Sequence, residues 1–110
     1  MPGVYTVTQM NSYIKNMFRQ DFVLSRISVK GEVSNCKYHT SGHIYFSLKD
    51  GQGVMSAIMF AGSAKNLEFR LENGMQVIVS GRIDVYERDG KYQLYANCLL
   101  YTSPSPRDRS

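Results

Sequence analysis

The chain has 110 residues, with 13 Lys and Arg against 9 Asp and Glu, which gives a formal net charge of +4. This length suits one small domain, and 43% hydrophobic with 20% charged residues is typical of a globular protein and excludes a mainly disordered chain. No segment reaches the roughly 20 consecutive apolar residues of a membrane span, and we expect no secretory leader because the first residues lack a basic region followed by an apolar stretch. The two cysteines are too few for a disulfide framework. We therefore expect a cytoplasmic protein without a membrane partner.

The first predicted element is an amphipathic helix over residues 9–19. Thr8 is the expected N-cap. Apolar residues follow it at the spacing of one helix face, namely Met10, Tyr13, Ile14, Met17 and Phe18. After residue 24 the period changes to two, which predicts a strand rather than more helix.

Alternating side chains predict five strands in all. The cleanest is HIYFSLKD, residues 43–50, in which Ile44, Phe46 and Leu48 share one face. The other strands are expected from residue 24 to about 33, and over residues 54–60, 76–86 and 91–97. A short helix is expected between Ser63 and Phe69, because this segment contains helix formers, and Asn73-Gly74 then ends it with a turn signal. The order is helix, three strands, short helix, two strands.

This order indicates an OB-fold, a five-stranded Greek-key barrel with a helix between strands 3 and 4. Gly31 and Gly81 lie inside the first and fourth strands, where bends let long strands curl and pair with two neighbours. An SH3-like barrel also has five strands, but it would not place a helix after the third. The fold class is therefore mainly β, and the barrel with its N-terminal helix is expected to occupy residues 1–97.

The last residues, 98–110, differ sharply in composition from what precedes them. They read CLLYTSPSPRDRS, and the stretch rich in Ser, Pro and Arg predicts a disordered tail. The segment also looks like translated vector sequence. We therefore expect the native sequence to end near Asn97 or Cys98.

The expected binding face lies where OB barrels bind oligonucleotides or oligosaccharides, on strands 2 and 3 and the loops beside them. Rings next to cations suit single-stranded nucleic acid, because bases stack on rings and phosphates require neutralisation. Packing in strands is the alternative explanation for each ring taken alone. The residues expected on this face are Lys37, Tyr38, His43, Tyr45, Lys49, Phe60, Arg82, Tyr86, Arg88 and Lys91.

Metal and catalytic sites are not expected. Cys36, His39 and His43 have a spacing that zinc tolerates, but a structural zinc site requires four ligands, and the only other cysteine, Cys98, lies in the segment expected to be non-native. Asp50 and Asp89 stand in glycine turns, where Asp is a turn former. Without grouped carboxylates or a nucleophile with its base, we expect no catalytic residue, no metal and no cofactor.

Several strings together resemble one known family. These are YTVTQMNSYIKNMF, ISVKGEVSN, SGHIYFSLKD, NGMQVIVSGRIDVYE and GKYQLYA, which cover residues 4–97 with an MF dipeptide at residues 59–60. They resemble the N-terminal OB-fold domain of the large subunit of bacterial exodeoxyribonuclease VII, and GEVSN before SGHIYFSLKD is the most specific part. The resemblance implies DNA-binding roles for Asn35, His43, Tyr45, Lys49 and Phe60.

The resemblance further implies that the chain is a fragment of a longer enzyme. That enzyme degrades single-stranded DNA from its ends into oligonucleotides. Its catalytic domain follows in the same subunit, and a later helical region carries small subunits. We expect this domain to bind and position single-stranded DNA without catalysing cleavage. The alternatives are a docking module within the enzyme and a stand-alone small nuclease on a barrel.

Overall fold

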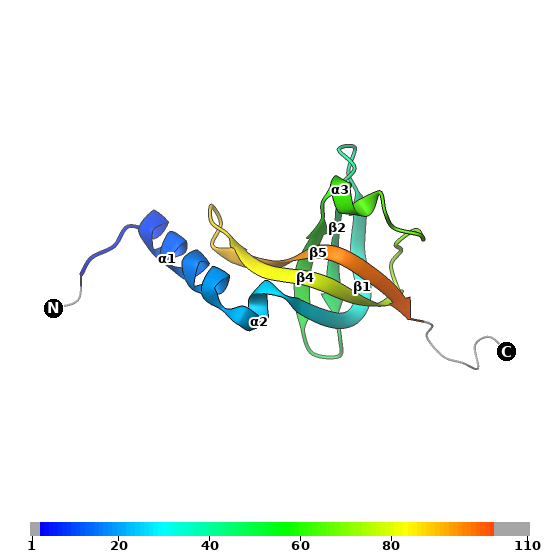
Figure 1. Cartoon of the computed structure of the whole chain (residues 1–110), viewed down its shortest axis with the longest axis horizontal. Helices are drawn as coiled ribbons and strands as arrows, with labels where there is room; N and C mark the ends of the chain where they lie inside the picture. Colours follow the sequence, from blue (N-terminus) through cyan, green and yellow to red (C-terminus); the bar gives the residue numbers. More distant parts are fainter. Residues whose placement is uncertain (1–2, 103–110) are drawn as a thin grey trace.

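A computed structural model describes residues 3–102, which form a closed five-stranded barrel with a helix beside it (Figure 1). The strands follow the order β1-β2-β3-β5-β4 around the barrel, and only the β3–β5 pair is parallel. The expected OB-fold barrel is confirmed. No helix within residues 3–102 is long and apolar enough to cross a membrane. The elements are α1 (Val7–Gln20), α2 (Phe22–Ser25), β1 (Ile27–Tyr38), β2 (Ile44–Lys49), β3 (Val54–Met59), α3 (Ala61–Ala64), β4 (Gln76–Tyr86) and β5 (Lys91–Thr102).

The barrel interior is filled by the apolar side of each strand. In β2 the predicted alternation is confirmed, since Ile44, Phe46 and Leu48 are buried while Tyr45 and Lys49 are exposed. Alternation of this kind leaves one whole face of the strand free for another role. The core cluster consists of Val33, Ile44, Phe46, Leu48, Ala57, Met59, Leu71, Val77, Val79, Ile83, Leu94, Ala96 and Leu99.

The two strand glycines stand where backbones approach closely. A Cβ at Gly81 would lie 2.0 Å from the carbonyl oxygen of Tyr95, next to the bulge between Ser80 and Gly81. A Cβ at Gly31 would lie 3.0 Å from the carbonyl oxygen of Lys49. Around Gly31, β1 changes partner from β4 to β2. The predicted bends are therefore present, and they let β1 pair twice.

Helix α1 begins two residues earlier than expected, at Val7, because Thr6 and not Thr8 is its N-cap. The N–H of Gln9 donates to Thr6 Oγ1 (3.0 Å), and the N–H of Thr6 donates to Gln9 Oε1 (2.9 Å). This reciprocal capping box satisfies two backbone donors at the helix start. The shorter helix α2, capped by the side chain of Asp21, follows directly and was not predicted.

The apolar face of α1 is largely turned away from the barrel. Phe18 packs on the core and lies 6.3 Å from the ring of Tyr92, measured between centroids. The helix is otherwise attached by polar groups: Asn11 donates to the carbonyl of Glu87, and Lys15 donates to that of Val85. The remaining apolar side chains of this face, Met10, Tyr13, Ile14 and Met17, stay exposed.

Two predicted boundaries differ from the structure. Strand β5 runs to Thr102, and Leu99 is buried in the core, so residues 98–102 belong to the barrel where a disordered tail was expected. Pairing with β4 as far as Gln76 holds this part of the strand in place. The rest of the expected tail, residues 103–110, lies outside the described residues. The short helix expected from residue 63 to 69 is instead α3, at residues 61–64.

Candidate nucleic-acid interface

The outer surface of the barrel carries one row of residues that are in register across all five strands. Lys37 pairs with Tyr45, Tyr45 with Ile58, Ile58 with Tyr95, and Tyr95 with Arg82. Directly paired residues point to the same face of a sheet. We call these five residues the cross-strand row. It places one ring on each side of Ile58, with one cation at each end of the row.

Ile58 is the central residue of this row, between Tyr45 and Tyr95. It points outward, opposite to its neighbours Ala57 and Met59 in the core, and is nevertheless only 5% exposed. Its register partners are Tyr45 and Tyr95, which flank it on β2 and β5. Sequence alone left open which face of β3 is buried, because both are apolar. The side with Ala57 and Met59 faces the core, while on the outer side Ile58 is covered but Val54 and Ser56 stay exposed.

More rings extend the row toward the β1–β2 and β3–α3 connections. His43 lies 6.5 Å from Tyr45 and 5.1 Å from Phe60, and Phe60 stacks on Tyr95 at 5.9 Å, all between ring centroids. His43 Nδ1 accepts the N–H of Ala61 (2.9 Å), so its Nε2 carries the proton of the neutral ring. The rings therefore form a continuous surface over β2, β3 and β5, which includes His43, Tyr45 and Phe60 of the predicted residues.

A bulge in β1 decides which side chains join this surface. The register with β2 slips by one residue between Ser34 and Lys37, and Asn35 has a left-handed backbone with φ of 49°. One inserted residue reverses which side chains face outward. Lys37 therefore faces outward beside Tyr45, while Tyr38 shares the side of Ile44, its register partner.

Tyr38 is thus not part of the ring surface, contrary to the prediction. Its hydroxyl donates to the carbonyl of Leu71 (3.0 Å) and accepts the N–H of the same residue (2.8 Å). The guanidinium of Arg70 covers its ring at 4.2 Å. Burial raises the pKa of the Tyr38 hydroxyl above its ordinary value of 10.0, although the bond to Leu71 opposes the shift. The ring joins β1 to the segment before β4.

The remaining predicted residues lie away from the row. Lys49 is on the outer face of β2 but at the far end of the strand, where it pairs with Glu32 and Val54. Tyr86, Arg88 and Lys91 lie at the tip of the β4–β5 hairpin, where Asn11 of α1 donates to the carbonyl of Glu87. Asn35 occupies the bulge. The structure therefore brings Lys37, His43, Tyr45, Phe60 and Arg82 together and leaves the other six outside this cluster.

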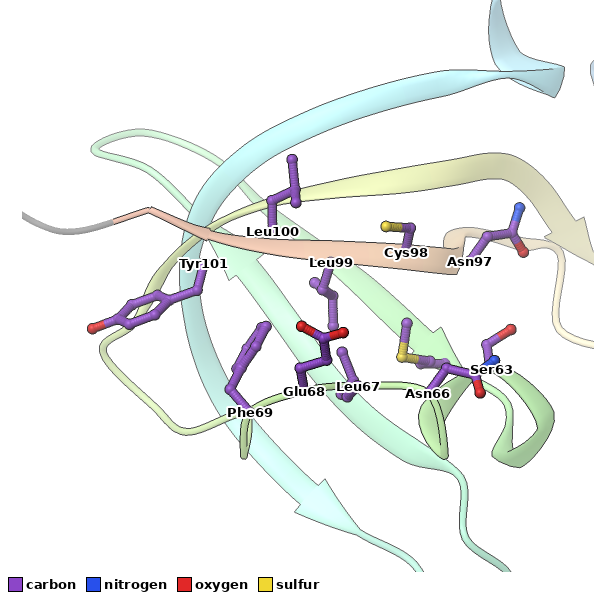
Figure 2. Close-up of a pocket in the computed structure, with 11 residues that line it drawn as sticks. Ser63, Asn66, Leu67, Glu68, Phe69, Asn97, Cys98, Leu99, Leu100 and Tyr101 are labelled. Atoms are coloured by element: carbon purple, nitrogen blue, oxygen red, sulfur yellow. The ribbon is translucent and has the colours of Figure 1, made fainter.

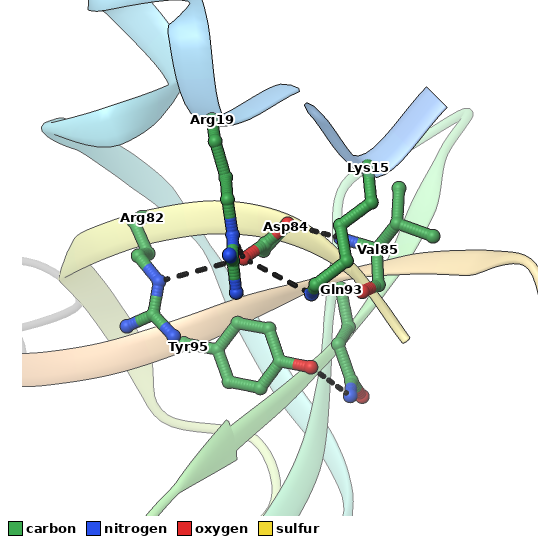
Figure 3. A network of polar contacts seen from close by, with 7 residues as sticks. All are labelled: Lys15, Arg19, Arg82, Asp84, Val85, Gln93 and Tyr95. Atoms are coloured by element: carbon green, nitrogen blue, oxygen red, sulfur yellow. Dashed lines mark hydrogen bonds and ion pairs between the residues drawn. The ribbon is translucent and has the colours of Figure 1, made fainter. Parts of the chain in front are cut away.

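Arg82 belongs to a charged cluster between α1 and β4 (Figure 3). Asp84 is buried beneath α1 although it lies on the outer side of β4, and its Oδ2 is 3.3 Å from Lys15 Nζ and 3.5 Å from Arg19 Nε. Arg82 Nε is 3.9 Å from the same oxygen. Burial acts to raise the pKa of Asp84, but the Val85 N–H and Lys15 outweigh it and hold the pKa below its ordinary value of 3.8. The carboxylate is therefore charged near neutral pH.

Tyr95 is the main residue of this surface that sequence reasoning missed. Arg82 lies over its ring, with the guanidinium carbon 4.7 Å from the centroid, and its hydroxyl accepts a hydrogen bond from Gln93 Nε2 at 3.0 Å. The sequence does contain a pattern that predicts the outward position of Tyr95. Leu94 and Ala96 are apolar, so alternation along KYQLYAN places Gln93 and Tyr95 together on the outer face.

A separate pocket of about 460 Å³ lies between β5 and the segment after α3 (Figure 2). Phe69 and Tyr101 line one end of it, with ring centroids 5.7 Å apart, and Glu68 is its charged residue. No Lys or Arg is among the described residues that line it. A carboxylate without a cation repels phosphate, so this pocket does not fit a nucleic-acid backbone.

The cysteine and histidines with zinc-like spacing have other partners. Cys36 Sγ lies 3.5 Å from the carbonyl oxygen of Leu71, and burial raises the pKa of this thiol. His39 Nδ1 accepts the N–H of Ser41, while His43 Nδ1 accepts that of Ala61. Within residues 3–102 no three His, Cys, Asp or Glu side chains are grouped as metal ligands.

The closed barrel, its β3–β5 pairing and the row of outer rings define an oligonucleotide-binding type of domain. The chain belongs to the family of OB-fold nucleic acid binding domains, whose model matches residues 5–99. Within this family it is similar to the exodeoxyribonuclease 7 large subunit of Lachnoclostridium phytofermentans. The two are 69% identical over 96 residues, which are 87% of this chain and 24% of that protein. The predicted family resemblance is confirmed, and the chain spans about a quarter of this relative.

Solved structures with much lower sequence identity share the fold. The asparaginyl-tRNA synthetase of Entamoeba histolytica matches with a TM-score of 0.62 and 16% identity, over 83% of this chain and 23% of that one. A replication protein A heterotrimer bound to single-stranded DNA matches with a TM-score of 0.58 and 15% identity, over 73% of this chain and 59% of that one. At such identities these likenesses establish the barrel alone.

Proposed function

We propose that this domain binds single-stranded DNA across the cross-strand row. The observation that carries the proposal is the register of Tyr45, Ile58 and Tyr95, which puts two rings on one outer surface between Lys37 and Arg82. Bases stack on aromatic faces without regard to sequence, and cations neutralise the phosphates between them. We therefore expect little sequence preference.

The surface suits a single DNA strand that runs across the outside of the barrel from β1 to β4. Tyr45 is 42% exposed and Phe60 is 44% exposed, so both rings have area left for a base. Tyr95 is covered in part by Phe60 and Arg82, and it serves to position both. The neutral His43 points its Nε2–H away from the Ala61 bond, where it is available to a phosphate or base oxygen.

We further propose that the domain delivers DNA to a nuclease centre in a longer large subunit. Support comes from the relative named exodeoxyribonuclease 7 large subunit, of which this chain spans 24%. The cross-strand row itself contains no carboxylate or activated nucleophile, so its chemistry is that of binding. In this proposal the longer enzyme degrades single-stranded DNA from its ends in the cytoplasm, with the catalytic domain and the small subunit as partners.

A fluorescence anisotropy titration with labelled oligothymidylate tests the binding role. Tyr45→Ala and Phe60→Ala should each weaken binding by about 1–3 kcal/mol, the value of one stacked base. Tyr13→Ala is the matched control, because Tyr13 is 61% exposed on α1 and lies outside the row. Unchanged affinity in both row variants would contradict the proposal. Affinity that does not fall with added salt would remove the role of the cations.

A docking role is the second candidate, and it is favoured by the exposed apolar face of α1. Tyr13 and Met17 are 61% and 56% exposed on this face. The occupant we propose is the rest of the longer polypeptide, since the matched relative is about four times as long as the matched segment. The tagged chain should retain the remainder of the Lachnoclostridium large subunit on a column. The double variant Tyr13→Glu, Met17→Glu should lose it, and equal retention would rule this face out.

A further inference from the structure

The geometry points to a phosphate-binding site formed by Arg19 of α1 and Arg82 of β4, which carries the nucleic-acid path off the barrel and onto the helix. The inference rests on the proposed binding of single-stranded DNA and extends it beyond the cross-strand row. Neither Arg19 nor Lys15 was among the residues predicted from sequence. Both reach this surface only because α1 crosses β4 at Asp84 (Figure 3).

The cluster contains more positive than negative charges. Lys15, Arg19 and Arg82 all approach the single oxygen Oδ2 of Asp84, at 3.3, 3.5 and 3.9 Å. Among residues 3–102 no other carboxylate lies within ion-pair distance of these three cations. The cluster therefore holds a surplus of two positive charges. A buried carboxylate requires one good partner for its own stability, so two of the three cations remain to bind a second anion.

The two arginines line the same groove beside Asp84, and both are exposed. The contact of each arginine with Asp84 is made through Nε, at 3.5 Å for Arg19 and 3.9 Å for Arg82. The side chains are 61% and 47% exposed, in contrast to 19% for Lys15. The planar guanidinium fork matches two phosphate oxygens. Lys15 instead secures α1, because its ammonium also donates to the carbonyl of Val85 at 2.7 Å.

The space for the anion lies between the helix and the strand. A groove of about 330 Å³ is lined by Phe18, Arg19, Ser25, Arg82, Ile83 and Asp84. Phe18 and Ile83 are its apolar lining residues, the buried Asp84 carboxylate lines it as well, and the exposed arginines form its charged rim. Arg82 also covers Tyr95, the last ring of the cross-strand row. A nucleotide stacked near Tyr95 would therefore place its next phosphate at this rim.

The test compares oligothymidylates of about 5 and about 16 nucleotides, the range of site sizes for one OB-fold. The whole 110-residue chain is titrated at several salt concentrations with the variants Arg19→Gln and Arg19→Lys. Lys30→Gln is the control, because Lys30 is an exposed cation of β1 that pairs in register with Ile78, away from α1. Thermal melting checks that each variant is folded.

We expect Arg19→Gln to weaken binding of the long oligonucleotide several-fold and to leave the short one unchanged. The slope of log affinity against log salt should become shallower by about 0.7, the contribution of one phosphate contact on a single strand. Arg19→Lys should keep most of the slope because it keeps the charge. Lys30→Gln should match the parent chain.

The outcomes separate this inference from the proposed function. If Tyr45→Ala weakens binding of both oligonucleotides while Arg19→Gln changes neither affinity nor slope, the row binds DNA and the α1 site is wrong. A change as large in Lys30→Gln as in Arg19→Gln would also overturn it, since the effect would then be one of overall charge. If the parent chain binds neither oligonucleotide, the proposed function itself fails.

Discussion

Tyr38 and Leu71 exchange two hydrogen bonds through one hydroxyl group, which donates to the Leu71 carbonyl at 3.0 Å and accepts the Leu71 N–H at 2.8 Å. Leu71 is only 1% exposed. The hydroxyl thereby takes the place of a strand partner for a segment that precedes β4 and has no ladder bonds at this point. An exposed tyrosine next to a predicted binding loop is in this case a structural residue.

Tyr38→Phe should therefore lower stability and leave DNA binding intact. The substitution removes the hydroxyl and leaves the N–H and carbonyl of Leu71 without this partner, which costs about 1–3 kcal/mol. Urea unfolding followed by circular dichroism measures the free energy, and an oligothymidylate titration measures affinity. Tyr45→Phe is the matched control, because no hydrogen bond of the Tyr45 hydroxyl is present among the described residues. A loss of affinity in Tyr38→Phe without loss of stability would return Tyr38 to the binding surface.

Asn35 should tolerate glycine and reject a β-branched residue. Its φ of 49° is left-handed, a conformation that glycine adopts freely and that costs other residues about 1–2 kcal/mol. Asn35→Gly should keep the stability of the parent chain, while Asn35→Val should lose about that amount in urea unfolding. The DNA affinity of Asn35→Gly separates the two roles of this residue. Unchanged affinity supports a purely structural role, and a clear loss would support the DNA contact implied by the family resemblance.

Gly81→Ala should disrupt the barrel. The added Cβ would lie 2.0 Å from the Tyr95 carbonyl oxygen, and its nearest neighbours are backbone atoms of Tyr95 and Ala96, which cannot move aside as a flexible side chain could. We expect a loss of more than about 3 kcal/mol, at the upper end for overpacked sites, measured as a lower midpoint in urea. Gly62→Ala is the control, since nothing lies within 4 Å of its added Cβ. Equal midpoints for the two variants would contradict the close approach of β4 and β5.

The barrel could be predicted from sequence because its two main signals are local. Alternation in residues 44–48 identifies the buried side of β2, and Gly31 and Gly81 mark strand positions where another backbone approaches closely, too closely for any side chain at Gly81. The end of β5 could not be predicted in the same way. Its last residues are held by pairing with β4 and by Leu99 in the core, whereas their composition is that of a tail.

The candidate site was predictable only in part, because a single bulge changes the facing of several residues. Without the insertion at Asn35, Tyr38 would face outward and Lys37 inward. The stretch SNCKY has no clear apolar alternation that would reveal the slip. Arg19 could not be predicted from sequence for another reason. Its place beside Arg82 depends on how α1 crosses β4. This crossing brings Arg19 into contact with Asp84, a residue 65 positions away in the sequence.

Asp84→Asn should destabilise the chain at neutral pH and have progressively less effect in acid. The folded pKa of Asp84 lies below its unfolded value of 3.8, because the Val85 N–H and Lys15 outweigh the effect of burial. Stability that comes from a depressed carboxyl pKa is present above the unfolded value and is lost as pH falls through the folded one. At neutral pH we expect a cost of about 1.5–3 kcal/mol, the value of hydrogen bonds to a charged group. Urea unfolding of parent and variant from neutral pH to below 3.8 measures the difference.

The informative quantity is the difference in free energy of unfolding between the parent chain and Asp84→Asn. Other carboxyl groups titrate in the same pH range, but their contributions cancel in this difference. It should be largest above pH 3.8 and should shrink as the pH falls below this value. Asp89→Asn, at an exposed carboxylate in the β4–β5 turn, is the matched control and should follow the parent chain throughout. A constant difference down to the lowest pH would mean that the Asp84 charge does not hold α1 against β4. The arginine pair would then lack the anchor that keeps Arg19 beside Arg82.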